Sequence, residues 1–132
     1  MKFRSISLMV VIGLVLVVAL AACGGGGGGA PQPASSSSST FNVTATEFKF
    51  EPNTFNAKAG EQLTFKVTNK GTVDHNFVIL SADGSQELAK TEIKVGQTAT
   101  LNYTPPAAGT YQIDCNLPGH KEAGMTGTLT VK

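Results

Sequence analysis

The sequence contains few of the side chains from which disulfides and metal sites are built. Its 132 residues include two cysteines, two histidines and three methionines, and no tryptophan. Two cysteines cannot form the disulfide framework of a small secreted domain. Two histidines cannot supply two separate histidine-built metal centres. The chain can therefore build at most one metal site that uses two histidines.

An excess of charge of one sign is also lacking. The chain has ten Lys and Arg against nine Asp and Glu, a formal net charge of +1. Two of the basic residues, Lys2 and Arg4, lie at the very start, so the rest of the chain has eight basic and nine acidic side chains. A nearly neutral domain without a basic run gives no support for nucleic-acid binding.

Residues 1–22 have the three parts of an export signal: basic residues, an apolar stretch from Ile6 to Leu20, and small residues. The stretch is shorter than the roughly 18–20 residues that span a bilayer. Leu20-Ala21-Ala22-Cys23 resembles the lipobox of bacterial lipoproteins, in which the cysteine is acylated. We therefore expect export and a lipid anchor on Cys23 at the outer face of the cytoplasmic membrane, on the periplasmic or extracellular side. An uncleaved N-terminal helix is the alternative anchor.

Residues 23–40 join this anchor to the rest of the chain. They contain an unbroken glycine run, two prolines and a run of five serines. Such a segment behaves as a flexible coil and cannot build a core, so we expect a disordered tether. The remaining segment, 41–132, has 92 residues, enough for one core and too few for two domains.

Strand signals dominate residues 41–132. Six segments are rich in β-branched and aromatic residues, mostly in period-two alternation: 41–50, 62–68, 76–80, 98–103, 111–115 and 126–131. Turn-forming Gly, Pro and Asn residues separate them. The pattern predicts an all-β fold, an antiparallel Greek-key sandwich or barrel of about seven to eight strands. We expect one short helical turn at 82–90.

Sulfur and imidazole side chains gather in the last third of the chain. Cys115, His120 and Met125 lie within eleven residues, and His75 precedes Cys115 by forty. Each alone would more commonly be a surface histidine, a core methionine or an inert buried cysteine. Together they are the ligand set of a blue copper electron-transfer centre, with Cys and two His in a plane and a weak axial Met. They predict one copper ion.

The motifs around these residues resemble the cupredoxins. The matching motifs are Phe48-x-Phe-x-Pro52, Gly60-x-x-Leu-x-Phe65, His75-Asn76-Phe77, Gly109-x-Tyr111 and Cys115-x-x-Pro118-Gly119-His120-x-x-x-x-Met125-x-Gly127. The gap from His120 to Met125 is similar to that of the auracyanins, membrane-associated blue copper proteins. The resemblance covers residues 41–132. It implies a β-sandwich that transfers single electrons by cycling type 1 copper between Cu(II) and Cu(I), with these four residues as ligands.

The resemblance also implies roles for neighbours of the ligands. Asn76 would direct its backbone N–H at the Cys115 sulfur and tie two ligand loops together with its side chain. Leu117 retains an N–H for a second hydrogen bond to the sulfur. Each such bond withdraws charge from the thiolate and is expected to raise the reduction potential. Azurin-like proteins have a glycine at the position of Asp74, and the carbonyl of that glycine approaches the copper. Because this chain departs from that pattern, the sequence does not establish a fifth ligand.

His120 would be the partly exposed electron port, surrounded by a small apolar docking patch. The patch comprises Leu117, Pro118, Gly119, His120, Ala123 and Gly124. It suits brief, weak docking of a monomer to membrane-bound or periplasmic electron donor and acceptor proteins. We expect the nearby charged residues Asp114, Lys121 and Glu122 to be solvated.

The sequence alone is compatible with other functions. A copper enzyme would need a second copper or an open coordination position, and both histidines are used by one site, so we expect no enzyme. A copper-binding module without an electron-transfer role fits the same ligands, although copper chaperones commonly present several Met or Cys. Zinc would fit the same ligands too, giving a colourless protein. A Cys23–Cys115 disulfide is possible if lipidation fails.

Overall fold

The structure is a computed structural model that describes residues 37–132. The predicted signal, the lipidation site Cys23 and most of the predicted tether lie outside the described residues. The described part contains nine strands: β1 (Ser38–Thr46), β2 (Lys49–Glu51), β3 (Thr54–Ala57), β4 (Gln62–Asn69), β5 (His75–Leu80), β6 (Glu87–Ile93), β7 (Thr98–Tyr103), β8 (Gly109–Asp114) and β9 (Thr126–Val131). None of its segments forms a helix long and apolar enough to cross a membrane.

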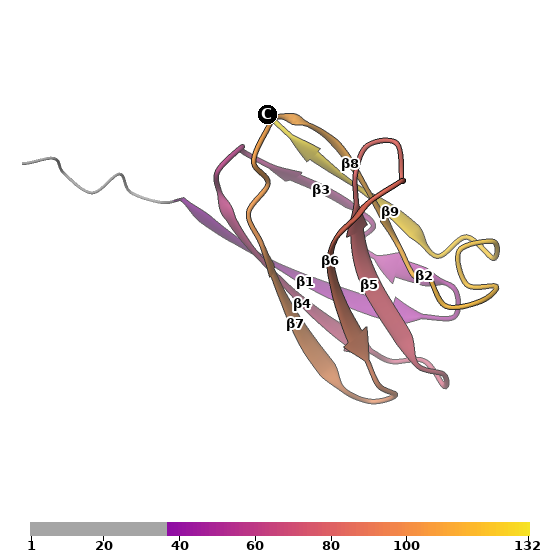
Figure 1. The fold of residues 1–132 in the computed structure, drawn as a ribbon. Helices are drawn as coiled ribbons and strands as arrows, with labels where there is room; N and C mark the ends of the chain where they lie inside the picture. Colours follow the sequence, from indigo (N-terminus) through magenta and orange to yellow (C-terminus); the bar gives the residue numbers. More distant parts are fainter. Residues whose placement is uncertain (1–36) are drawn as a thin grey trace, which may run out of the picture. The chain divides into compact units, whose positions relative to one another are not determined.

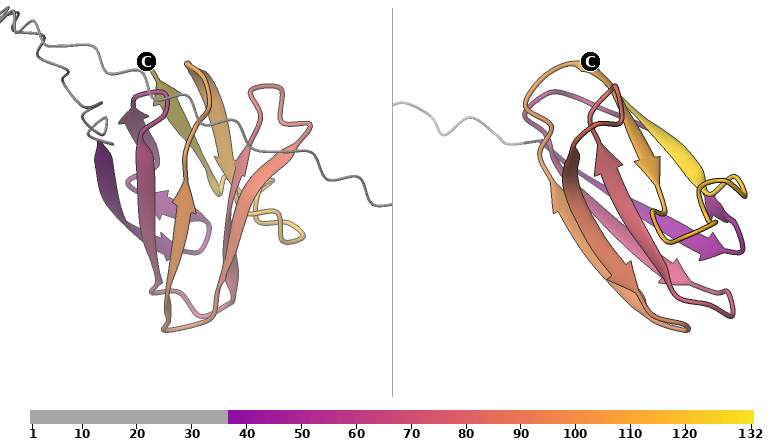
Figure 2. Two further views of the ribbon diagram at one scale, coloured as in Figure 1. Left: turned by 60° about the vertical axis from the view of Figure 1, so that its left-hand side comes forward. Right: turned by 45° about the vertical axis from the view of Figure 1, so that its right-hand side comes forward.

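The strands form two sheets that face each other as a sandwich (Figure 1). One sheet has the order β2-β1-β4-β7, and the other has the order β3-β9-β8-β5-β6. The two views of Figure 2 show the layers from other sides. The prediction of an all-β sandwich is thus confirmed. The sheets are mixed, however, because β1 pairs with β4, and β3 with β9, in parallel. The predicted antiparallel pattern therefore does not hold at these two places.

The described strands outnumber the seven to eight predicted. The segment 41–50, expected as one strand, divides into β1 and β2 at a turn formed by Glu47 and Phe48. These two strands then pair with each other in antiparallel fashion. The apolar residues change phase at this turn, from positions 41, 43 and 45 to positions 48 and 50. This shift was the mark of the division, and the sequence interpretation missed it.

Strand β1 begins at Ser38, inside the segment expected to be a tether. Residues 38–40 pair in register with residues 62–64 of β4. The hydroxyl of Ser39 also donates a hydrogen bond to the carboxylate of Glu61, which is 7% exposed. Pairing with a neighbouring strand therefore orders the end of the serine run, although serine itself favours loops.

The predicted helical turn at 82–90 is absent from the described chain. Ser81 and Gln86 instead close a turn, with the N–H of Ser81 donating to the carbonyl of Gln86 at 3.0 Å. The Asp83 carboxylate accepts hydrogen bonds from the hydroxyl of Ser81 at 2.6 Å and the N–H of Ser85 at 3.1 Å. Asp and Ser side chains favour such turns over helix because they bond to nearby groups of their own loop.

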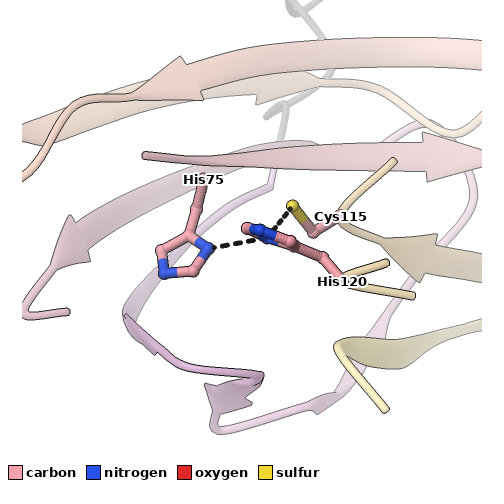
Figure 3. A group of neighbouring side chains, drawn as sticks. All are labelled: His75, Cys115 and His120. Atoms are coloured by element: carbon pink, nitrogen blue, oxygen red, sulfur yellow. Dashed lines mark hydrogen bonds between the residues drawn. The ribbon is translucent and has the colours of Figure 1, made fainter. Parts of the chain in front are cut away.

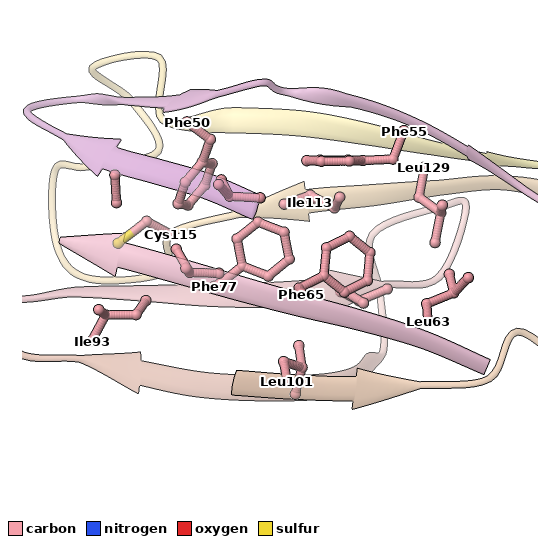
Figure 4. Packing of buried hydrophobic residues seen from close by; sticks show 14 of the residues in the cluster. Phe50, Phe55, Leu63, Phe65, Phe77, Ile93, Leu101, Ile113, Cys115 and Leu129 are labelled. Carbon is pink, nitrogen blue, oxygen red and sulfur yellow. The ribbon is translucent and has the colours of Figure 1, made fainter. Parts of the chain in front are cut away.

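The core between the sheets is built around aromatic rings (Figure 4). The ring centroid of Phe65 on β4 lies 5.2 Å from those of Phe41, Phe55 and Phe77. The same buried cluster extends to Cys115 and Met125. Two of the predicted metal ligands are thus part of the hydrophobic core, which packs too densely to let them move freely.

Candidate metal centre

Two sheet neighbours and one loop bring the predicted ligands together. His75 is the first residue of β5, and Cys115 directly follows the last residue of β8. These strands are paired, with Val78 opposite Asp114, so their ends lie side by side. His120 belongs to the loop that joins β8 to β9. Figure 3 shows the side chains of His75, Cys115 and His120 converging on one another.

The donor atoms of these three residues all lie within 4.8 Å of one another. The His75 Nδ1 is 3.2 Å from the His120 Nδ1, which is 3.3 Å from the Cys115 Sγ. His75 and Cys115 are buried, whereas His120 is partly exposed. One sulfur and two imidazole nitrogens that converge in this way fit a copper ion, which takes a thiolate and two imidazoles.

Met125 is held beside them by backbone hydrogen bonds. Its side chain is fully buried. Its N–H donates to the carbonyl of His120 at 3.0 Å, and its carbonyl accepts from the N–H of Cys115 at 3.1 Å. These two bonds close the loop on itself, so the three loop ligands keep fixed positions relative to one another. The four residues together are arranged as a type 1 copper site.

The ligand loop is a series of tight turns. The N–H of His120 donates to the carbonyl of Leu117 at 3.1 Å, and the N–H of Gly124 donates to the carbonyl of Lys121 at 2.9 Å. Gly124 has a φ of 102°, a conformation that residues with a side chain rarely adopt. The turns put His120 at the outer end of the loop, which explains its partial exposure.

Asn76 links the thiolate to the ligand loop. Its N–H donates to the Cys115 sulfur at 3.4 Å. Its side chain makes two hydrogen bonds to Asn116, one to the side-chain oxygen at 2.7 Å and one from the backbone N–H at 2.9 Å. These contacts join β5 to the first residue of the loop. They also fix the sulfur with a hydrogen bond of the kind that tunes such sites.

The second hydrogen bond that the Leu117 N–H could donate to the sulfur is not present among the described residues. The carbonyl of Leu117 serves the turn that ends at His120, and its side chain packs against the core. The sequence offered this bond as a possibility, and the described residues do not form it. In the described part of the chain, the backbone N–H that reaches the sulfur is that of Asn76.

Asp114 is not solvated, contrary to expectation. It is 2% exposed, and its Oδ2 forms an ion pair of 2.8 Å with the ammonium group of Lys121. Its Oδ1 is buried without a hydrogen-bond partner in the described chain. Asp114 ends a central strand, so its side chain faces other protein atoms, and Lys121 reaches back from the loop to neutralise it. Lys121 and Glu122 are exposed, as expected.

The surroundings of His75 favour its neutral form. Burial lowers the pKa of this imidazole, and the nearby His120 lowers it further. Neutral imidazole is the form that binds a metal. Its Nε2 is buried with no hydrogen-bond partner in the described chain. Asp74 directly precedes His75, and its carboxylate accepts hydrogen bonds from Lys94 at 2.8 Å and from the N–H of Val95 at 3.1 Å. Both bonds lower the pKa of Asp74, and the bond from Lys94 is the larger cause.

Two residues that the sequence interpretation gave no role also contact the site. The Phe48 ring lies edge-on to the His120 ring, with centroids 4.9 Å apart and planes at 68°. The Glu47 carboxylate accepts hydrogen bonds from the loop that precedes His75. The only available signal was the Phe48-x-Phe-x-Pro52 motif, which marks the segment but not its spatial neighbours.

The predicted docking patch lies on the ligand loop. Pro118, Gly119, Ala123 and Gly124 are exposed, and Leu117 and His120 are partly exposed. Phe48, at 39% exposure, adds an aromatic ring next to His120. The loop surface around the exposed imidazole is therefore largely uncharged and apolar, apart from Lys121 and Glu122.

A β-sandwich with one thiol, two imidazoles and a thioether at the end of its core defines a type 1 copper protein. Residues 9–131 match the protein family described as cupredoxin-like domain, and the chain belongs to this family. The expected resemblance is confirmed.

Similar proteins include both copper-resistance and electron-transfer members of the family. The chain is 27% identical over 105 residues to the copper-resistant cuproprotein CopI of Rubrivivax gelatinosus, covering 68% of this chain and 64% of that protein. It is 36% identical over 87 residues to chloroplastic plastocyanin of Hordeum vulgare, covering 62% of this chain and 54% of that one. The chain thus spans less than two thirds of the length of either relative.

A solved structure with the same fold is the dithionite-reduced auracyanin of the photosynthetic bacterium Roseiflexus castenholzii. It superimposes with a TM-score of 0.65 at 26% sequence identity, covering 73% of this chain and 98% of that one. Auracyanin B superimposes with a TM-score of 0.63, also at 26% identity, covering 70% of this chain and 88% of that one. The predicted similarity to auracyanins is confirmed.

Proposed function

We propose that this chain carries single electrons between redox proteins and catalyses no reaction on a small substrate. The observation that supports this most is the ligand set itself: His75 and Cys115 are buried, and His120 reaches the surface. A copper ion bound there supplies a centre that gains and loses one electron. The partly exposed imidazole offers a short route for that electron to a docked protein.

The chain's own contribution is to keep the ligands still. Every ligand movement that accompanies a change of charge adds to the barrier for electron transfer, and a rigid site keeps this barrier low. His75 begins a strand whose six residues are all buried. Cys115 and Met125 are joined by a backbone hydrogen bond of 3.1 Å. Both histidines are used by the one centre, which leaves no second histidine-built site for catalysis.

The proposal includes a location and partners. The lipobox-like sequence ending at Cys23 supports a lipid anchor at the outer face of the cytoplasmic membrane. A glycine- and serine-rich tether after it would let the domain reorient between membrane-bound or periplasmic donors and acceptors. The apolar surface around His120 suits weak and brief docking of a monomer. Mass spectrometry of the protein from host membranes tests the anchor, with Cys23→Ala as the variant expected to lose lipid and membrane association.

The test of the central claim is spectroscopic. The purified chain with added Cu(II) should show an intense blue thiolate-to-copper band and narrow copper hyperfine splitting, and Cys115→Ser should lose both. A colourless protein or an ordinary tetragonal copper spectrum would overturn the proposal. A charged substitution at the docking patch, Ala123→Glu, should keep the blue spectrum but slow electron exchange with a partner protein.

The similarity to CopI favours a second candidate, a copper-binding module without an electron-transfer role. That relative is described as a copper-resistant cuproprotein. The two functions differ in how fast the bound copper changes oxidation state. Fast electron self-exchange, seen as NMR line broadening in mixed oxidised and reduced samples, supports the carrier. Slow exchange, together with copper sensitivity of a deletion strain, would support the binding module.

A further inference from the structure

The turn between β1 and β2 contacts both the loop that precedes His75 and the loop that carries His120. Its two residues, Glu47 and Phe48, are adjacent in the sequence. Glu47 contacts the loop that leads into His75, and Phe48 contacts His120. The two loops are separated by more than forty residues in the sequence, and this turn belongs to neither of them.

Glu47 is bound to the His75 loop by several donors. Its Oε1 accepts hydrogen bonds from the N–H of Thr72, from the hydroxyl of Thr72 at 3.1 Å and from the N–H of Val73 at 3.2 Å. The backbone N–H of Thr72 is the main cause that lowers the pKa of Glu47 to about 2. At neutral pH the side chain is therefore an anion, which makes these hydrogen bonds stronger than neutral ones.

The contact is close as well as strong. A Cβ at Gly71 would lie 2.5 Å from the Glu47 Oε1, so a side chain at this position would displace the Glu47 carboxylate. Asn69 holds the same loop from the other side, because its side-chain oxygen accepts from the N–H of Gly71 at 2.9 Å and its Nδ2 donates to the carbonyl of Val73 at 2.8 Å. The loop before His75 is thus fixed between Asn69 and Glu47.

Phe48 restrains the other histidine. Its ring lies edge-on to the His120 imidazole at 4.9 Å, in the arrangement that aromatic pairs favour. His120 is the more exposed of the two imidazoles. The His75 ring also lies next to it, with centroids 5.1 Å apart. Together the two rings restrict how far His120 can turn.

We propose that Glu47 and Phe48 form a clamp that holds the His75 loop and the His120 imidazole in fixed relation, which makes them positioning residues for the metal ligands. The proposal rests on the proposed function only in that the ligands it positions are those of the copper site. Loss of either end of the clamp should loosen His120 without unfolding the domain.

The experiment compares Phe48→Ala, Glu47→Ala and the double variant with the unaltered chain. The readout is the rate at which the reduced, copper-loaded protein gives up copper to an excess of the chelator bicinchoninate. Phe48→Ala should release copper about two- to tenfold faster, the range that one aromatic contact supplies. Glu47→Ala should also release copper faster, because it frees the other end of the clamp. Because a clamp needs both ends, the double variant should be no faster than the faster single one.

Matched controls separate the clamp from general surface effects. Leu88 is as exposed as Phe48, at 39%, and Glu51 pairs only with the exposed Lys49 in the described chain. Leu88→Ala and Glu51→Ala should release copper at the rate of the unaltered chain. The milder Phe48→Leu and Glu47→Gln, with thermal unfolding of every variant, cover the case in which an alanine variant fails to fold.

A second readout does not depend on copper. In the metal-free chain, NMR relaxation should show greater motion at His120 and at Thr72 and Val73 in both single variants. Release rates that multiply in the double variant, or rates equal to those of the controls, would overturn the clamp. If the unaltered chain lacks a blue spectrum, the proposed function fails, and the metal-free relaxation data alone decide on the clamp.

Discussion

Met125 is fully buried among core residues, and its backbone is hydrogen-bonded to those of Cys115 and His120. When copper is bound, the Met125 thioether would supply some electron density to the ion, and the oxidised ion would benefit more than the reduced one. Met125→Leu should therefore raise the reduction potential, measured by protein-film voltammetry. Because leucine has a similar volume, the free energy of unfolding should fall by less than about 1.5 kcal/mol. An unchanged potential would show that the thioether does not act as a ligand.

Gly127 is required by a close approach of two backbone segments. A Cβ at this position would lie 2.6 Å from the carbonyl oxygen of Asn53, which accepts the N–H of Thr128 at 2.8 Å. Gly127→Ala must push β9 away from this loop and should cost about 1–3 kcal/mol of unfolding free energy, measured by urea titration. Thr126→Ala, at an exposed neighbouring position, should stay within about 0.5 kcal/mol. Equal values for the two variants would contradict this explanation of the glycine.

At the scale of elements, the loop between β8 and β9 depends on one ion pair across its base. Asp114 precedes Cys115, Lys121 follows His120, and the pair therefore spans two ligands at 2.8 Å. The two partners are unequal, because Asp114 is buried and the Lys121 side chain is 47% exposed. Removing the lysine leaves a buried carboxylate without its counter-charge. Removing the carboxylate only frees an ammonium group that water can solvate.

Lys121→Met should therefore lower the free energy of unfolding by about 1–3 kcal/mol. Asp114→Asn should lower it by less than about 1 kcal/mol. Urea unfolding of the metal-free protein measures both. A double variant close to Asp114→Asn alone would show that the cost of Lys121→Met comes from the unpaired carboxylate. Equal costs for the two single variants would mean that the pair is as weak as an ordinary surface ion pair.

The strands could be predicted where local alternation decides them. In β4, for example, Leu63, Phe65 and Val67 alternate with more exposed residues and face the core. The order of the strands could not be predicted, because the parallel pairing of β1 with β4 joins segments whose sequences carry no mark of each other. For the same reason, the sequence did not predict that β1 begins at Ser38, because this start depends on pairing with β4.

The ligand set could be predicted because few residue types bind copper and all four stand in one motif-rich sequence. The clamp and the buried Asp114 could not. Each depends on which side chain meets another across the sheets, as Phe48 meets His120 and Lys121 meets Asp114. Charged and aromatic residues in loops are usually solvated, so the pattern alone favoured that interpretation.

At the scale of the whole molecule, the core and the metal centre are one packed body. The aromatic cluster around Phe65 continues through Phe77 to Cys115 and Met125. Cys115 and Met125 are consequently held by the same packing that stabilises the fold. His75 is buried beside it on β5, and His120 is the partly exposed exception. A protein built in this way can keep its ligand positions before copper binds, which suits a centre that must change little between oxidation states.

The stability of the molecule should fall in acid. Hydrogen bonds from Ser81 and Ser85 lower the pKa of Asp83 from its ordinary 3.8 to about 2, and the hydrogen bonds of Glu47 lower its pKa from 4.5 to about 2. Because the folded carboxylates hold their protons less tightly than the unfolded ones, they stabilise the fold above about pH 4.5. That contribution should disappear as the pH falls toward 2.

Asp83→Asn isolates one of these contributions in the metal-free chain, because its partners lie in the Ser81 to Ser85 turn and not among the metal ligands. The unaltered chain should be more stable than this variant at pH 6, and the difference should shrink steadily between pH 4.5 and 2, as measured by urea unfolding at each pH. Ser85→Ala, which removes one donor to the carboxylate, should show a smaller pH-dependent difference of the same sign. A difference that stays constant with pH would mean that the Asp83 carboxylate stabilises the turn by its shape alone, since only a lowered pKa makes the stabilisation depend on protonation.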